Sequence, residues 1–352
     1  MKQLAEETEA TPQQIITQSI TTITEDAKAK LPSIPHIRRN IRRQRQTLKH
    51  PLSDPRNVDD IIIPEQYTMT QDGQQFLLFD SGAKSKGRMF LFGTKDNLRL
   101  LEVNQHWFMD GTFKTAPALF SQLYTVHALV NGRTVPCVYA LLQNKTQETY
   151  TALLQQLTVL NTNLQPISIM IDFEMAVIKS VERVFPECEV KGCFFHLSQN
   201  IYRKIQDSGL QQLYQVDSEF ALKLRMLPAL AFVPIEHMSY AFEKLLEIFP
   251  QEAMPIADYF EDYYIGRPQR RGRRQPMFPL DIWNMHTRAE DHMPKTNNSV
   301  EGWHRSFQSH MGFNIFNRGL ENTKQNSKGL QCVYQCGLQF HKKKQLPVIG
   351  LV

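Results

Sequence analysis

The chain has 352 residues, of which 41% are hydrophobic and 21% are charged, as is ordinary for a globular protein with a large core. No apolar run approaches the roughly 18 residues of a membrane span, and the N-terminus, MKQLAEETEATPQQ, lacks the apolar segment of a signal peptide. Five cysteines without an export signal favour reduced thiols inside a cell over a disulfide scaffold.

The basic residues are clustered, although the net charge of +5 is mild. Residues 36–50, HIRRNIRRQRQTLKH, contain no acidic residue, and residues 267–274, RPQRRGRR, are mostly arginine. Such runs are typical of nucleic-acid phosphate contacts or nuclear import signals, and also of solvated loops. The arginines that we expect to contact a nucleic-acid backbone are Arg38, Arg39, Arg42, Arg43, Arg45, Arg270, Arg271, Arg273 and Arg274.

The chain begins with a polar region. Residues 1–64 are rich in Thr, Gln and Glu and then become basic, which predicts a partly disordered segment in which the basic run is able to form a helix. Residues 65–103 contain two short apolar runs, QFLLFD and RMFLFG, separated by a loop with glycine. These runs predict two paired strands in a small β pre-domain.

From residue 104 the apolar pattern becomes regular. The expected elements are strands at 106–113, 120–130 and 133–142, a helix at 146–160, a strand at 167–173, a helix at 174–185, a strand at 188–195 and a helix from His196. Short turns make the first three strands antiparallel, whereas helical connections make the later strands parallel to the first. The predicted fold class is α/β, with a mixed five-stranded sheet and flanking helices as in ribonuclease-H-like domains.

The rest of the chain divides into three parts. Residues 210–295 carry the second arginine run and predict an all-helical insertion. Residues 296–311 return to a strong helical pattern and would complete a core that begins with residues 104–209. Residues 312–352 form an atypical C-terminal tail.

Two aspartates stand at the ends of strands that are expected to be neighbours. Asp110 follows the apolar run HWFM, and Asp172 ends the run ISIMI. Two carboxylates at one edge of a sheet repel each other unless a cation separates them, and two Mg²⁺ ions roughly 4 Å apart are usual in phosphodiester chemistry. The alternatives are a turn at Asp110-Gly111 and a helix N-cap at Asp172.

Three further residues carry chemistry. Glu301, in TNNSVEGWHRSF, is the candidate third acid, although its spacing from Asn298 also fits a capping box. Cys193 and His196 form a C-x2-H pair, which is half of a zinc site, but no second pair with conventional spacing follows. We therefore expect no structural zinc, a buried Cys193, and a His196 that assists proton transfer or phosphate positioning.

Five blocks of the sequence resemble the transposases of Mutator-like elements, the MULE family. The blocks are MDGTFKTAP, QLYTVHALVNGRTVPCVYALLQNKTQETY, IMIDFEMAVIKSV, VKGCFFHLSQNIYRKIQ and TNNSVEGWHRSF, which occur in the family's order across about residues 104–311. The resemblance implies a DDE triad on a ribonuclease-H-like fold, interrupted by a helical insertion. It makes Asp110, Asp172 and Glu301 the metal-binding acids, and it matches Cys193 and His196 to a C-x2-H motif beside the active site.

This resemblance implies a nuclear enzyme that binds two Mg²⁺ or Mn²⁺ ions. Its partners would be double-stranded DNA, at element ends and at the target, and a second copy of the chain in a homo-oligomer. The enzyme would hydrolyse DNA phosphodiesters and join the resulting 3′-hydroxyl to target DNA, and Gly111 would let DNA or metal approach the backbone.

A different interpretation is a catalytically inactive, truncated or domesticated copy that binds DNA or a protein. Residues 1–100 lack the cysteines of the zinc finger that often precedes this core, and the tail lacks the apolar helix expected behind Glu301. A nuclease of the same fold is a third interpretation, which the helical insertion disfavours.

Overall fold

The computed structural model divides the chain into two compact units, Met1–Asp54 and Pro55–Val352. It describes residues 2–8, 10–21, 24, 27–28, 31–49, 55–70 and 72–310. The tail at 312–352 lies outside the described residues. Among the helices that are described, none is both long enough and apolar enough to span a bilayer.

The described helices of the first unit are α1 (Lys2–Glu7), α2 (Pro12–Ile20) and α4 (Ile34–Lys49). Thr11 is the N-cap of α2. Its hydroxyl accepts a hydrogen bond from the amide of Gln14, while the Gln14 side chain accepts one from the amide of Thr11. Ile37 and Ile41, one helical turn apart on α4, are buried against the other helices together with Ile15. The apolar face of α4 is thus turned inward.

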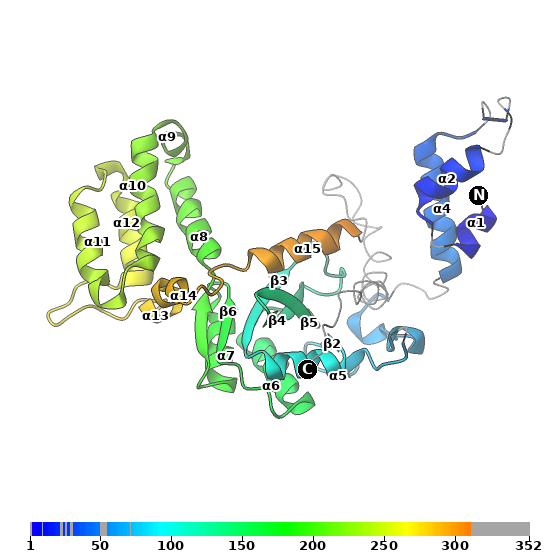
Figure 1. Cartoon of the computed structure of the whole chain (residues 1–352), viewed down its shortest axis with the longest axis horizontal. Coiled ribbons are helices and arrows are strands. Elements are labelled where there is room, and N and C mark those ends of the chain that lie inside the picture. The colour runs from blue at the N-terminus through cyan, green and yellow to red at the C-terminus, as the bar shows by residue number, and fades with distance from the viewer. Residues whose placement is uncertain are drawn as a thin grey trace. The chain divides into compact units, whose positions relative to one another are not determined.

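The second unit is built on a seven-stranded mixed sheet (Figure 1). Its strands are β1 (Leu77–Asp80), β2 (Phe90–Phe92), β3 (His106–Thr112), β4 (Gln122–Val130), β5 (Arg133–Leu142), β6 (Ser168–Ile171) and β7 (Glu189–Gly192). They lie in the order β1-β2-β5-β4-β3-β6-β7. As predicted, β3, β4 and β5 are antiparallel neighbours, while β6 is parallel to β3 and β7 is parallel to β6.

The sheet has more strands than the five predicted. β1 and β2 pair with each other, as predicted, but β2 also pairs with β5, with Phe90 opposite Leu141. Without β2, one edge of β5 would carry unpaired amide and carbonyl groups. The two N-terminal strands therefore extend the same sheet.

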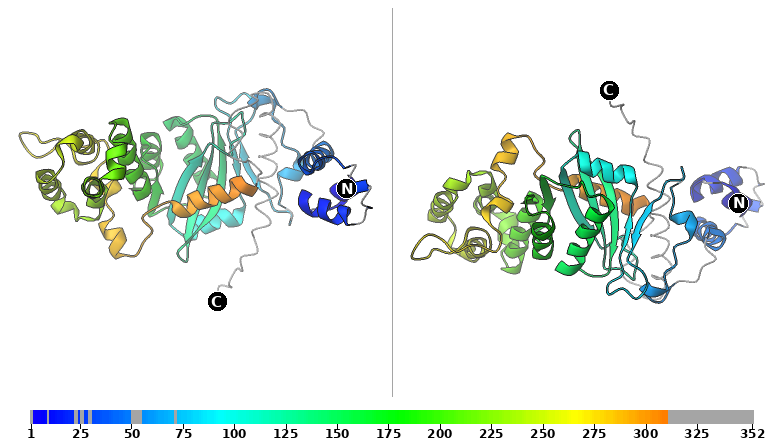
Figure 2. Two further views of the ribbon diagram at one scale, coloured as in Figure 1. Left: turned by 90° about the horizontal axis from the view of Figure 1, so that it is seen from above. Right: turned by 90° about the horizontal axis from the view of Figure 1, so that it is seen from below.

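Helices cover both faces of this sheet. They are α5 (Lys95–Val103), α6 (Gln147–Leu160), α7 (Met175–Val184) and α15 (Asn298–His310). Val138 and Ala140 of β5 share a core with α6, whereas Tyr139 and Leu141 pack in a second cluster with Trp303 of α15. Because alternate strand residues point to opposite faces, α15 covers the face opposite α6, and two opposed views show it in front of the sheet and then behind it (Figure 2).

A helical part follows β7 and precedes α15 (Figure 1). It contains α8 (Phe194–Asp207), α9 (Gln211–Val216), α10 (Ser218–Ala229), α11 (Met238–Glu247), α12 (Met254–Phe260), a π-helical segment η6 (Glu261–Ile265), α13 (Leu280–Trp283) and α14 (His286–Glu290). Tyr264 and Trp283 are fully buried at its centre, where the indole N–H of Trp283 donates to the carbonyl of Tyr264.

Candidate active site

Asp110 lies inside β3, opposite Thr125 of β4, rather than in a turn. It has the same strand parity as Phe108, which packs with Val300 of α15, so its side chain points to the α15 face. There Oδ2 lies 3.3 Å from Nδ1 of His304, and the side chain is only 12% exposed. A strand residue thus presents a nearly buried carboxylate beneath a helix.

Asp172 directly follows β6, the parallel neighbour of β3. Its side chain is 49% exposed, and its Oδ1 accepts the amide of Phe173. Helix α7 begins at Met175 with Glu174 at the N-cap position, so the N-cap alternative for Asp172 does not hold. Its carboxylate instead opens into the same pocket as Asp110.

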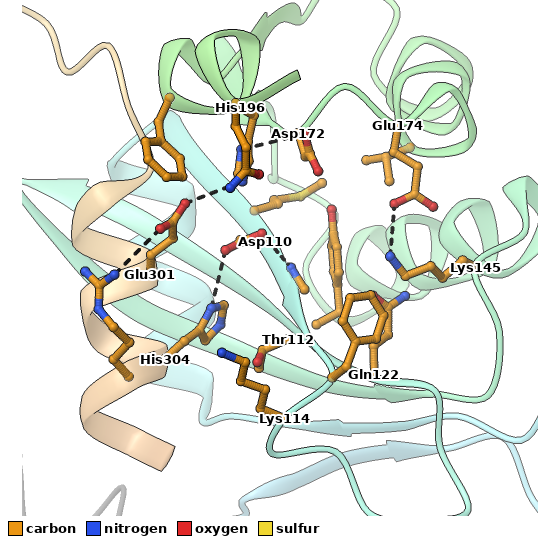
Figure 3. A pocket seen from close by; sticks show the side chains of 18 of the residues that line it. Asp110, Thr112, Lys114, Gln122, Lys145, Asp172, Glu174, His196, Glu301 and His304 are labelled. Carbon is orange, nitrogen blue, oxygen red and sulfur yellow. Dashed lines mark hydrogen bonds and ion pairs between the residues drawn. The ribbon is translucent and has the colours of Figure 1, made fainter. Parts of the chain in front are cut away.

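Glu301 lies in the first turn of α15. Its Oε1 is buried without a hydrogen bond, and Oε2 lies 3.9 Å from Arg305 Nη1. His196 of α8 stands between this residue and Asp172: its Nε2 lies 3.4 Å from Glu301 Oε1 and its Nδ1 lies 3.7 Å from Asp172 Oδ1 (Figure 3). The imidazole thus separates two of the three predicted acids.

The electrostatics of His196 and Glu301 reflect this crowding of carboxylates. Burial disfavours the charged imidazole, but the neighbouring Cys193 sulfur and Asp172 carboxylate outweigh burial and raise the pKa of His196 to about 9. Burial also raises the pKa of Glu301, an effect that the charge of His196 opposes and that of Asp110 reinforces. The pocket therefore concentrates negative charge, which a bound cation would stabilise.

The donor chemistry of the three acids suits Mg²⁺, which prefers oxygen ligands. Oε1 of Glu301 is buried and makes no hydrogen bond, and its ion-pair contact is His196. Within the described part of the chain, however, no group of three or more His, Cys, Asp or Glu side chains is close enough together to hold a metal ion. Metal binding would require Asp172 and Glu301 to leave His196 and approach Asp110.

Cys193 has a structural position. It is fully buried at the start of α8, and its sulfur accepts the backbone amide of Asn297 at 3.1 Å. It packs with Phe108, Met170 and Val300 and does not line the pocket. The two residues of the C-x2-H pair therefore have different roles. Cys193 connects α8 to the segment before α15, whereas His196 faces the acids.

Gly111 lines the pocket and is also closely packed against β4. A Cβ atom at this position would meet Gln122 Oε1 and would lie 3.1 Å from a ring carbon of Tyr124. Gln122 is fully buried and donates from Nε2 to the hydroxyl of Tyr150 at 2.8 Å. Glycine is needed because β4 presents large buried side chains to this point of β3.

The pocket is a cavity of about 480 Å³ that also exposes residues not singled out from the sequence. Its lining includes the cations Lys114, Lys145, Arg203 and Arg305, the carboxylate Glu174, the aromatic residue Phe113 and the histidine His304. His304 follows Glu301 by three residues, a spacing that places both on one helix face. That spacing was the available signal, whereas nothing in the local sequence marks the cations.

The arginines predicted to contact DNA fall into different surroundings. Arg38 donates to Gln13 within the first unit, Arg39 is exposed, and the side chains of Arg42, Arg43 and Arg45 lie outside the described residues. In the second unit, Arg273 and Arg274 form ion pairs, whereas Arg270 and Arg271 are exposed. Among those whose side chains the structure describes, none lines the pocket.

Comparison with known proteins finds one family match. A family model described as the MULE transposase domain matches residues 106–200. The matched segment runs from β3 into α8 and contains Asp110, Asp172 and His196, while Glu301 lies beyond it. No curated protein matches the chain.

Among solved structures, the chain is similar to one described as a Drosophila P element transposase strand transfer complex. The two share 11% sequence identity with a TM-score of 0.24, over 71% of this chain and 69% of the other.

Proposed function

We propose that this chain is a DDE-type DNA transposase with a ribonuclease-H-like core. The observation that carries the proposal is that Asp110, Asp172 and Glu301, which come from three distant segments, line one pocket, and that the first two lie in the segment matched by the MULE transposase model. The strand order β5-β4-β3-β6-β7, antiparallel in its first half and parallel in its second, supports the assignment of the core. The reaction would be hydrolysis of DNA phosphodiesters followed by transfer of the 3′-hydroxyl to target DNA.

In the proposed mechanism the three acids would hold Mg²⁺, which would supply Lewis-acid activation of the attacking oxygen and charge stabilisation of the leaving one. The cations at the pocket rim, Lys114 and Arg203 among them, attract the phosphate of the substrate. Before metal binds, a proton on His196 between Asp172 and Glu301 would offset the repulsion of these acids. Duplex DNA at element ends and at the target, a homo-oligomeric assembly and a nuclear location belong to the same proposal.

The test is cleavage and joining of labelled DNA ends by the full chain with Mg²⁺ or Mn²⁺. Asp110→Asn should lower activity by at least about 100-fold, because it removes one of the charges that would hold the metal. Glu174→Gln is the matched control: this carboxylate lines the same pocket but is held by Lys145 and Tyr150, so it should retain activity. Thermal unfolding must show that both variants are folded. Undiminished activity of Asp110→Asn would refute the site.

A catalytically inactive, DNA-binding copy is the second candidate. The pairing of His196 with Asp172 and Glu301 favours it, because among the described residues no three such side chains are gathered closely enough to hold a metal ion. Titration of the chain with Mn²⁺ in a calorimeter separates the two candidates. Binding that Asp110→Asn weakens supports the enzyme, whereas unchanged Mn²⁺ binding in that variant together with retained DNA binding supports the inactive copy.

A further inference from the structure

The second arginine run forms a hairpin, residues 267–274, between η6 and α13. Pro268 pairs with Arg273 in an antiparallel bridge, and the amide of Gln269 donates to the carbonyl of Gly272 at 2.9 Å. Gly272 has a φ of +70°, which favours glycine at this turn. Arg270 and Arg271 are therefore the two residues at the tip. This segment lies at the end of the helical part away from the sheet (Figures 1 and 2).

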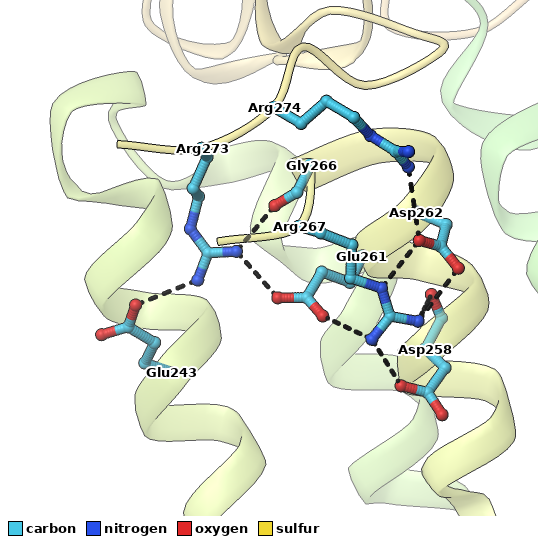
Figure 4. A network of polar contacts seen from close by, with 8 residues as sticks. All are labelled: Glu243, Asp258, Glu261, Asp262, Gly266, Arg267, Arg273 and Arg274. Atoms are coloured by element: carbon cyan, nitrogen blue, oxygen red, sulfur yellow. Dashed lines mark hydrogen bonds and ion pairs between the residues drawn. The ribbon is translucent and has the colours of Figure 1, made fainter. Parts of the chain in front are cut away.

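The base of the hairpin is held by a network of ion pairs (Figure 4). Arg267 makes a bidentate contact with Asp262, at 2.7 and 2.9 Å, and also reaches Asp258 at 2.9 Å. Arg273 donates to Glu261 at 2.8 Å and to Glu243 at 2.9 Å. Bidentate and multiply bonded guanidinium groups have a fixed geometry, so the base is anchored to the helices beneath it.

The backbone at the base is equally constrained. Gly266 has a φ of +88°, and a Cβ atom there would collide with the carbonyl oxygen of Arg274. The Gly266 carbonyl in turn accepts a hydrogen bond from Arg273 at 2.8 Å. The returning strand of the hairpin is thus packed directly against the end of the π-helical segment, which makes the tip a rigid projection.

The arginines of the hairpin fall into two groups, those whose charge is neutralised by nearby carboxylates and those whose charge is not. The basal arginines Arg267, Arg273 and Arg274 face four carboxylates, those of Glu243, Asp258, Glu261 and Asp262, so their charges are neutralised locally. Glu261 is almost fully buried, and a buried carboxylate is costly without a paired charge. Its arginine partners therefore have a structural role. Arg270 and Arg271 are exposed and have neither a hydrogen bond nor an ion pair with any described residue.

We propose that Arg270 and Arg271 form a binding tip for the phosphate backbone of duplex DNA, and that Arg267, Arg273 and Arg274 serve to hold this tip in place. The choice of DNA rests on the proposed function. Two adjacent guanidinium groups suit the binding of phosphate oxygens. Because the turn that carries them is already rigid, it loses little conformational entropy on binding. The tip is separate from the acid-lined pocket and would hold DNA away from the site of reaction.

The test measures binding of the full chain to a fluorescent mixed-sequence duplex by anisotropy over a range of salt. Each phosphate contact contributes about 0.9 to the slope of log affinity against log salt. Arg270→Ala with Arg271→Ala should therefore lower the slope by about 1.8, so that raising salt from about 50 to about 200 mM costs this variant about 12-fold less affinity than the wild type. Lysine at both positions should restore the slope.

The matched control is Arg99→Ala with Arg183→Ala, which removes the same charge from exposed helix positions outside the hairpin. It should leave the slope unchanged. An equal loss in the control, or an unchanged slope in the tip variant, overturns the proposal, as does a wild-type chain that does not bind duplex DNA. A tip-dependent slope in a chain without metal-dependent cleavage would refute the transposase reaction but keep the DNA-binding tip.

Thermal unfolding separates the two groups of arginines. The tip variant should unfold at the wild-type temperature, whereas Arg273→Ala should unfold at a lower one because it removes a partner from the buried carboxylate of Glu261. A wild-type melting temperature for Arg273→Ala would contradict the structural role of the base.

Discussion

Replacing His304 by alanine tests how α15 is held over the carboxylates. His304 is buried on α15, and its two ring nitrogens contact different strands: Nδ1 lies 3.3 Å from Oδ2 of Asp110 on β3, and Nε2 lies 3.0 Å from the hydroxyl of Thr125 on β4. The same hydroxyl lies 3.0 Å from Nε2 of His127. One imidazole thus connects the helix that carries Glu301 to the strand that carries the first acid.

The expected loss follows from these contacts. A neutral hydrogen bond contributes about 1 kcal/mol and one to a charged group about 1.5–3 kcal/mol. We therefore expect His304→Ala to lower the free energy of unfolding by about 3 kcal/mol, with a further contribution from the cavity beside Trp303 and His127. If α15 opens by itself, the same energy corresponds to about 100-fold faster amide exchange along it.

Urea denaturation and hydrogen exchange of residues 298–310 measure these effects. Arg305→Ala is the control: it is the next residue on the same helix, but its side chain is 72% exposed and should contribute less than about 0.5 kcal/mol. Thr125→Val should couple to His304→Ala in a double-mutant cycle by at least about 0.5 kcal/mol. Equal stability of His304→Ala and Arg305→Ala, with unchanged exchange of α15, would refute the proposed connection.

Three further outcomes follow from the packing of the second unit. Gly111→Ala should lose about 1–3 kcal/mol in chemical denaturation, because its methyl group displaces buried Gln122, and a loss below about 0.5 kcal/mol would contradict this. Arg88→Met should lose about 2–3 kcal/mol in the same assay, since its guanidinium pairs with 29%-exposed Asp80 at 2.7 Å; wild-type stability would count against it. Burial opposes the ionisation of Asp80, but the hydrogen bond and charge of Arg88 and the hydrogen bond from the Gly82 amide together outweigh burial and lower the pKa of Asp80 from 3.8. The pair therefore stabilises above pH 3.8 and loses this effect as pH falls through the lower folded value. The stability difference between wild type and Arg88→Met should therefore shrink in acid, and a difference independent of pH would argue against the pair.

The order and type of the central elements could be predicted from the sequence. Alternating or continuous apolar runs mark strands because burial on a sheet repeats every two residues, and the helix after Thr146 follows from its helical spacing and cap. The pairing of β3 with β6 followed from the length of the connections. The pairing of β2 with β5 could not be predicted, because the sequence of a strand does not specify which other strand it pairs with.

The candidate acids could be named from sequence, but their surroundings could not. The sequence by itself determined that Asp110 lies near the end of one strand, that Asp172 lies at the end of its neighbour, and that Glu301 lies near a helix start, because these depend on local pattern and topology. Only the tertiary structure decided that His196 lies between two acids, that Gly111 serves packing, and which arginines are neutralised by carboxylates. Those facts depend on side chains brought together from distant segments, because the distances between them decide which charges are paired and how much room each residue has.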